Sequence, residues 1–287
     1  MKRIFCPTDF SEQANHSVEA GYYLAKKFGA ELHLFHVIES ENEKDFNVQG
    51  ASPDGGGGGG GMDDVFLLKL IQATKSRMAE LLASSGLEQI NVTSDIRIGK
   101  PSKLIHEEIA SGSYDMVVIG TKGASGFNEM LIGSNAEKVV RRAKIPVLSV
   151  KSSVDENSFK SIIYASSFSE SEDKFINEIK GLQDAFGSTL HLVRINTPNN
   201  FLTDWTSRKV MQRFVKENDL SNYTINIYND TIEEDGIIYF AEEIDAGIIA
   251  MATHGRTGFA HLISGSIAED VVNHSKRPVL TYNLNMK

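Results

Sequence analysis

The chain has 287 residues, which corresponds to about two domains of ordinary size. Its 29 Lys and Arg against 38 Asp and Glu give a net charge of −9, and such a surface repels nucleic-acid phosphates and anionic lipids, which excludes both as expected partners. The longest apolar stretch, residues 246–252, falls far short of the ~20 residues of a membrane-spanning helix, so we expect no membrane segment.

In chain order, strand-like and helix-like patterns alternate. In the first half, strands are predicted over residues 3–8, 32–38, 90–98, 115–120 and 146–150, and helices over 11–29, 65–87, from Pro101, and over 134–143. In the second half, strands are predicted over 161–165, 190–196, 224–228, 247–251 and 279–282. Five strands alternating with helices in each half predict an α/β fold, two doubly wound five-stranded parallel sheets.

The two halves are repeats of each other. At an offset of 132, residues 120–150 align with 252–282, and 14 of the 31 positions are identical. At an offset of 158, residues 9–12 align with 167–170, and 28–34 with 186–192. The difference of 26 places an insertion near 39–64 in the first repeat, which includes seven consecutive glycines and predicts a mobile surface loop. We therefore expect domains at 1–151 and 158–287.

The glycines after the fourth strand form a candidate anion site. Gly120 and Gly123 flank the turn out of the strand, and Gly133-Ser134 opens the next helix. Free backbone N–H groups and the positive end of the helix dipole favour an anion at such a place. The alternative is purely structural: Gly120 and Gly123 turn the chain, and Ser134 caps the helix.

The spacing of these residues, Gly, two residues, Gly, nine residues, Gly-Ser, resembles the ATP-binding motif of the universal stress protein family. The segments Pro7 to Ser11 and His36-Val37 and the repeat itself extend the resemblance over nearly the whole chain, as in a tandem two-domain member. The resemblance implies strand order 3-2-1-4-5 in each domain, with the last strands pairing across a pseudo-two-fold axis. This pseudo-dimer within one chain leaves open a homodimer of the whole protein.

In ATP-binding family members, the positions matching Asp9 and Val37 contact the nucleoside, and those matching Gly120 and Gly123 approach the ribose and phosphates. The positions matching Gly133, Ser134 and Asn135 bind the phosphates. The resemblance thus implies ATP, with Mg²⁺ on its phosphates, at Pro7, Thr8, Asp9, Val37, Gly120, Gly123, Gly133, Ser134 and Asn135. For Asp9 the alternative is that its carboxylate caps the first helix. The second repeat has Ser167 for Asp9 and Ala252 for Gly120, which predicts a degenerate second site.

Other chemistry finds little support in the sequence. The one Gly-Lys pair is followed by Pro101, so the chain has no Walker loop. His33 and His36 lie three apart on a strand and face opposite sides, which argues against a shared metal. Cys6 lies in an apolar strand as a predicted core thiol, and a single cysteine forms no internal disulfide, which fits a cytoplasmic protein.

Two functions follow from these patterns. The first is an ATP-binding regulatory protein of the stress response that acts through a protein partner, and that is at most a slow ATPase because no catalytic base is visible. The alternative is a protein-interaction module of the same fold that binds no nucleotide. The complete set of motif residues in the first repeat favours nucleotide binding.

Overall fold

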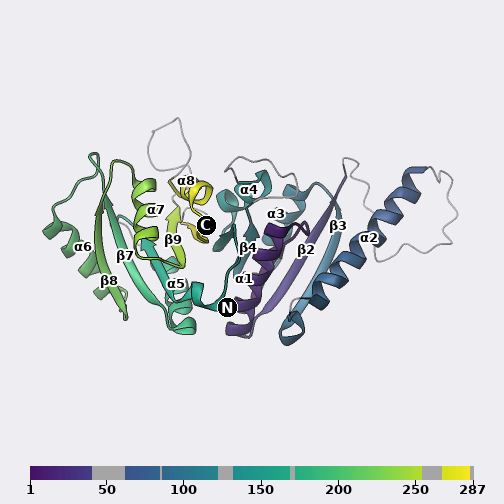
Figure 1. The fold of residues 1–287 in the computed structure, drawn as a ribbon, viewed down its shortest axis with the longest axis horizontal. Helices are drawn as coiled ribbons and strands as arrows, with labels where there is room; N and C mark the ends of the chain where they lie inside the picture. The colour runs from purple at the N-terminus through teal and green to yellow at the C-terminus, as the bar shows by residue number, and fades with distance from the viewer. Residues whose placement is uncertain (41–61, 85, 122–131, 169–171, 254–266, 285–287) are drawn as a thin grey trace.

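The computed structural model describes residues 1–40, 62–84, 86–121, 132–168, 172–253 and 267–284, in which strands and helices alternate (Figure 1). The strands are β1 (Arg3–Pro7), β2 (Glu31–Glu39), β3 (Asn91–Gly99), β4 (Met116–Gly120), β5 (Val147–Val150), β6 (Ser161–Ala165), β7 (Thr189–Asn196), β8 (Tyr223–Asn229), β9 (Ile248–Thr253) and β10 (Val279–Asn283). The α-helices are α1 (Glu12–Phe28), α2 (Met62–Ser84), α3 (Pro101–Ser111), α4 (Ser134–Arg142), α5 (Asp173–Phe186), α6 (Asp204–Glu217), α7 (Glu233–Glu243) and α8 (Ile267–His274), and two 3₁₀ turns are η1 (Leu87–Gln89) and η2 (Glu156–Phe159).

The ten strands form one sheet in the order β3-β2-β1-β4-β5-β10-β9-β6-β7-β8. Each half contributes five parallel strands in the order 3-2-1-4-5, and the two halves join where β5 pairs antiparallel with β10. In that pairing Leu148 lies opposite Leu280, its own counterpart in the repeat. The pseudo-two-fold axis therefore passes through this pair, and the predicted fold class is confirmed.

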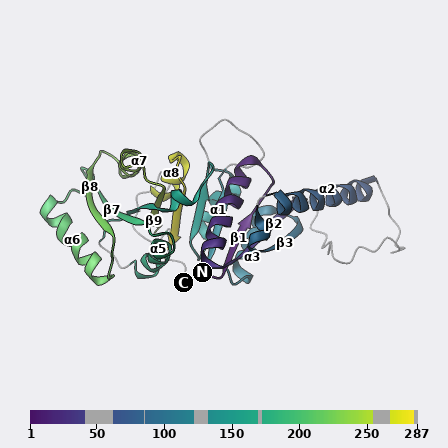
Figure 2. The same ribbon diagram turned by 60° about the horizontal axis from the view of Figure 1, so that its bottom comes forward.

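The two faces of the sheet have different cores because successive side chains of a strand point to opposite faces. Figure 2 shows α7 and α8 on one side of the second half's strands and α5 on the other. On the face of α1, α2, α5 and α6, a single hydrophobic cluster runs through both halves and includes Cys6, Leu148 and Leu280. The core on this face therefore does not stop at the boundary between the repeats.

The opposite face has two separate cores. One lies under α3 and α4 in the first half, and the other under α7 and α8 in the second half. The side chain of Ile132 packs against both of them. Ile132 is thus a hydrophobic link between the halves on this face.

The helix ends follow local signals in the sequence. Ser11 is the N-cap of α1, with its Oγ accepting from the N–H of Ala14 at 3.2 Å, and Gly29 ends the helix with φ of +61°. Glycine reaches such a backbone angle without the steric cost of a Cβ. The second helix differs from the expected 65–87: it ends at Ser84, and Leu87 lies in η1 after Gly86, whose φ is +66°.

The segment between the halves is short and ordered. Asp155 caps η2, with its carboxylate accepting from the N–H and hydroxyl of Ser158, both at 2.8 Å. In the described ranges, no helix is both long and apolar enough to cross a membrane. The expected insertion loop lies mostly in residues 41–61, outside the described residues.

Candidate functional site

The first candidate element is the turn that leads from β1 into α1. The N–H of Thr8 continues the β1–β2 ladder by donating to the carbonyl of Phe35 at 2.9 Å, and the Thr8 Oγ1 accepts from the N–H of Phe10 at 3.1 Å. Asp9 between them is exposed, and its Oδ1 accepts from the N–H of Ser11 at 3.0 Å. The N-cap residue of α1 is Ser11 and not Asp9, and the Asp9 carboxylate binds the N–H of that N-cap residue at the entrance of the helix.

His36 and Phe10 lie beside this turn. Phe10 has φ of +60°, and its ring centroid is 4.5 Å from that of His36. The His36 Nδ1 is 2.8 Å from the carbonyl oxygen of Thr8, so this nitrogen is the donor. Burial lowers the pKa of His36, against the opposing effects of this hydrogen bond and of Asp9. The neutral form of the His36 ring therefore donates the hydrogen bond that holds the turn. Val37, the next residue, is half-buried.

Gly120 ends β4 and lies against the first turn of α1. A Cβ at this position would be 2.9 Å from the carbonyl oxygen of Gln13 and 3.2 Å from the nitrogen of Ala14. Both are backbone atoms, which cannot move without moving the helix. Packing against α1 therefore requires a glycine at Gly120 whether or not a ligand binds, a reason that the sequence pattern alone does not reveal.

The start of α4 is the second candidate element. Gly133 is the N-cap of this helix, and its N–H donates to the carbonyl of Thr121 at 2.6 Å. No side chain caps the helix, and the exposed Ser134 is its first residue, so the alternative that Ser134 is the N-cap is wrong. The first N–H groups of a helix have no intrahelical acceptor, which leaves those of Ser134 and Asn135 for an anion. Gly123 lies outside the described residues.

These elements lie along one edge of the sheet. Pro7 ends β1 and is followed by Thr8 and Asp9, Val37 is near the end of β2, and Gly120 ends β4. These are three neighbouring parallel strands. The carbonyl of Thr121 holds the start of α4 against the end of β4. In open parallel sheets, ligands bind at this carboxyl edge, where the strand order reverses. Here the reversal falls between β1 and β4.

The corresponding edge of the second half keeps the backbone of this turn. The Ser166 Oγ accepts from the N–H of Phe168 at 2.9 Å, and Phe168 has φ of +57°, as at Thr8 and Phe10. A cavity of about 320 Å³ opens at this edge, between the ends of β6, β7 and β9 and the start of α8. The second half thus has a cavity at this edge, next to a turn with the same backbone conformation as in the first half.

The polar groups of that cavity differ from those of the first edge. Arg194 stands at the repeat position of His36, is 5% exposed, and donates to the carbonyls of Ser167 at 3.3 Å and Asn200 at 2.7 Å. Burial lowers the pKa of Arg194, and Glu233 opposes that effect. The cavity also holds the buried Glu172, whose carboxylate accepts from the hydroxyls of Tyr164 and Ser166. The glycine motif gives no sign of Arg194 and Glu172, although the 158-residue offset aligns them with His36 and Ala14.

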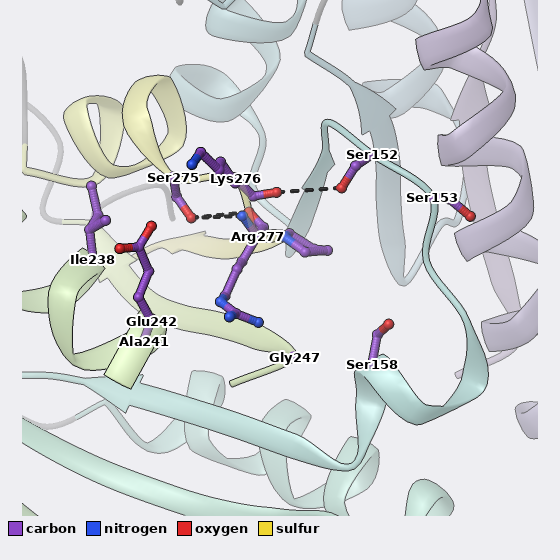
Figure 3. Close-up of a pocket in the computed structure, with 11 residues that line it drawn as sticks. Ser152, Ser153, Ser158, Ile238, Ala241, Glu242, Gly247, Ser275, Lys276 and Arg277 are labelled. Atoms are coloured by element: carbon purple, nitrogen blue, oxygen red, sulfur yellow. Dashed lines mark hydrogen bonds between the residues drawn. The ribbon is translucent and has the colours of Figure 1, made fainter. Parts of the chain in front are cut away.

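A further cavity, of about 260 Å³, lies between the connecting segment and the second half (Figure 3). Gly247 and Pro278, which line it, directly precede β9 and β10, so the cavity is at the amino ends of these strands. Its arginine, Arg277, donates to the carbonyl of Ala246 and to the Asp245 Oδ1. This is the opposite edge from the one where ligands of such sheets bind, and we assign it no ligand.

Metal and thiol chemistry find no basis in the part of the chain that the structure describes. No group of three or more His, Cys, Asp or Glu side chains there could hold a metal ion. Cys6 is fully buried, with its Sγ 3.6 Å from the Ser17 Oγ, and burial raises the pKa of its thiol to about 12. Cys6 is therefore a core thiol, as expected.

Comparison with known proteins identifies the class of this fold and site. The model of the universal stress protein family matches residues 1–151 and 158–283, and the chain belongs to this family. The universal stress protein Slr1230 of Synechocystis sp. is 23% identical over 299 residues, which covers 98% of this chain and all of that protein. The universal stress protein MJ0531 of Methanocaldococcus jannaschii is 26% identical over 150 residues, covering 52% of this chain and 82% of that protein.

A solved structure is similar over the same length. The crystal structure of a universal stress protein from Archaeoglobus fulgidus matches with a TM-score of 0.75 and 22% identity, over 98% of each chain. At this identity the likeness shows the fold alone. The resemblance of the sequence to the family is thus confirmed, and both halves of the chain carry it.

Proposed function

We propose that this protein is an ATP-binding regulatory protein of the stress response, with the nucleotide held mainly by its first domain, residues 1–151, and with little or no turnover. The observation that supports this proposal most directly is the carboxyl edge of the first half. An exposed carboxylate, Asp9, lies at the end of one strand, and a helix start that no side chain caps, at Gly133, follows the neighbouring strand.

The two elements suit the two ends of a nucleotide. The carboxylate of Asp9 can accept hydrogen bonds from ribose hydroxyls, while the N–H groups of Ser134 and Asn135 and the dipole of α4 favour phosphate. Mg²⁺ would be held chiefly by the phosphate oxygens, because the described residues offer no cluster of carboxylates or histidines for it. The second domain, residues 158–287, places Arg194 and Glu172 in the corresponding cavity, and a buried carboxylate there disfavours phosphate.

The test is calorimetric titration of the full chain with ATP and Mg²⁺, comparing wild type with Asp9→Ala and Gly133→Val. Loss of a hydrogen bond to a charged group costs about 1.5–3 kcal/mol, so we expect Asp9→Ala to weaken binding about tenfold or more. Gly133→Val places a branched side chain at the phosphate end and should abolish most binding. Ser167→Ala is the matched control, at the repeat position of Asp9, and should leave ATP affinity unchanged.

Two results would overturn the proposal. If wild type shows neither binding heat nor co-purified nucleotide, the fold serves as a protein-interaction module without this ligand. If a steady-state assay with excess ATP shows turnover of about one per second or faster, in the range of dedicated kinases, the protein is an enzyme. We expect turnover far below that value, because phosphoryl transfer needs a residue that orients the nucleophile and the described edge offers none.

A further inference from the structure

The helices α4 and α8 meet across the pseudo-two-fold axis, as Figure 1 shows above the central strands. Arg141 on α4 donates through Nε and Nη2 to the two carboxylate oxygens of Glu269 on α8, at 2.9 and 3.0 Å. The Asn283 Nδ2 donates to the carbonyl of Arg141 at 3.1 Å. The second half is therefore in direct polar contact with the helix whose first turn forms the proposed phosphate end.

A further contact from the second half reaches the turn that precedes α4. The side-chain Oδ1 of Asn273, near the end of α8, accepts from the N–H of Ile132 at 3.0 Å. The next N–H along the chain, that of Gly133, donates to the carbonyl of Thr121 in the first half. Two consecutive N–H groups at the entry to α4 are thus held by opposite halves of the molecule.

The position of this turn determines the positions of the N–H groups at the start of α4. Ser134 and Asn135 follow Gly133 directly, and the first intrahelical bond of α4 runs from the N–H of Glu137 to the carbonyl of Gly133. Ile132 is partly buried, and its side chain packs against the cores of both halves. Without the Asn273 acceptor, a half-buried N–H would lose its hydrogen bond, which is costly enough to shift the turn.

We propose that Asn273 is a positioning residue, through which the second half sets the affinity of the first half for the phosphates of its ligand. This inference rests on the proposed function. Because coupling between two sites is reciprocal, phosphate binding at the start of α4 also stabilises the contact with α8. Occupancy of the first site is thereby transmitted to the second half, where the cavity of Arg194 borders the other end of α8.

The experiment compares Asn273→Leu, which removes the acceptor, with Asn273→Asp, which keeps an oxygen at the same place. The carboxylate that Asn273→Asp introduces would lie near the Lys151 ammonium, which already donates to the backbone carbonyl of Asn273. The matched control is Glu269→Gln, which removes the charge and one of the two acceptor oxygens from the contact with Arg141 without touching the turn. For each variant we measure the affinity for ATP with Mg²⁺, the affinity for adenosine, and the hydrogen exchange of the Ile132 amide in the free protein.

We expect Asn273→Leu to weaken ATP binding about tenfold, or ~1.4 kcal/mol, and to speed exchange of the Ile132 amide, while adenosine affinity stays the same. Asn273→Asp should restore both properties, and Glu269→Gln should change neither. If Asn273→Leu binds ATP like wild type, or weakens ATP and adenosine equally, the inference is wrong while the proposed function stands. If wild type binds no ATP, both are wrong. An Ile132 amide that exchanges equally fast in wild type and Asn273→Leu contradicts the inference by itself.

Discussion

The two carboxyl edges of this sheet share a backbone and differ in the side chains that it carries. In both halves a residue after the first strand has left-handed φ, Phe10 and Phe168, and in both its N–H is held by the hydroxyl two residues earlier. In the first half the neutral His36 ring donates to the turn, whereas in the second half Arg194 donates to the carbonyls of Ser167 and Asn200, which line the cavity. The two halves therefore share the backbone of this turn but differ in the polar side chains beside it, which would decide what each edge can bind.

The opposite edge shows the same kind of divergence. At the entry to β4, the carboxylate of Asp115 accepts from the N–H groups of Lys2 and Arg3. The repeat counterpart of Asp115 is Gly247, at the entry to β9, where the connecting segment lies so close that a Cβ would be 1.9 Å from the carbonyl oxygen of Ser158. In the first half the residue at this position therefore binds the backbone at the start of β1. In the second half the residue at this position packs against the segment that joins the halves.

Replacing this glycine should have the largest effect on stability. In Gly247→Ala the new methyl group would overlap the backbone of η2, and neither backbone can yield cheaply. We expect a loss of roughly 3 kcal/mol in the free energy of unfolding, measured by chemical denaturation. Gly181→Ala in α5 is the matched control, because a Cβ there meets nothing within 4 Å, and it should gain about 0.5–1 kcal/mol. Equal effects of the two variants would contradict this account of Gly247.

Substitutions at Gly120, which ends β4, and at its repeat counterpart Ala252 in β9 should have a smaller effect. Gly120→Ala places a Cβ 2.9 Å from the Gln13 carbonyl oxygen, and we expect it to destabilise the protein by about 1–2 kcal/mol. The reverse change, Ala252→Gly, removes a methyl group from a position that already accepts one and should cost less. Thermal unfolding of both variants tests this difference. If Gly120→Ala is as stable as wild type, the glycine is there for the ligand and not for α1.

The smallest expected effect is the pH dependence that His36, in the first half, contributes to stability. The pKa of His36 in the folded protein lies below 6.5, because burial and Arg77 disfavour the charged ring more than the Thr8 carbonyl and Asp9 favour it. The unfolded chain therefore binds more protons between the folded pKa and about 6.5, so the contribution of His36 is complete above that range and is lost as the pH falls through it. Arg194, at the same position of the repeat, stays charged throughout.

The free energy of unfolding, measured from pH 7.5 to 5, should fall less steeply in His36→Gln than in wild type. Titration of the His36 ring by NMR gives the folded pKa directly. The buried His33 and the half-buried His191, whose pKa values burial also lowers, contribute to the slope that remains. A His36 ring that titrates above 6.5 would reverse the sign of the expected change.

Much of the molecule follows from patterns that act locally. The alternation of strands and helices, the Ser11 cap, the Gly29 stop of α1 and the repeat at an offset of 132 residues predict the fold class. The resemblance to the family implies the strand order and the pairing of the last strands. The helix Pro101–Ser111 begins at its proline as expected. Assignments that concern Gly123 and the glycine-rich insertion lie outside the described residues, and the boundaries of the two domains stay predictions.

The sequence by itself determined the fold class, the repeat and the edge of the sheet at which to look for a ligand, because strand periodicity, helix caps and glycine spacing act between residues close in the chain. Only the tertiary structure decided why Gly120 and Gly247 are glycines, which residue caps α4, and that Asn273 holds the turn before it. Each of these depends on a contact with backbone that the fold brings close. No local pattern encodes such a contact, since Ile132 and Asn273 are 141 residues apart.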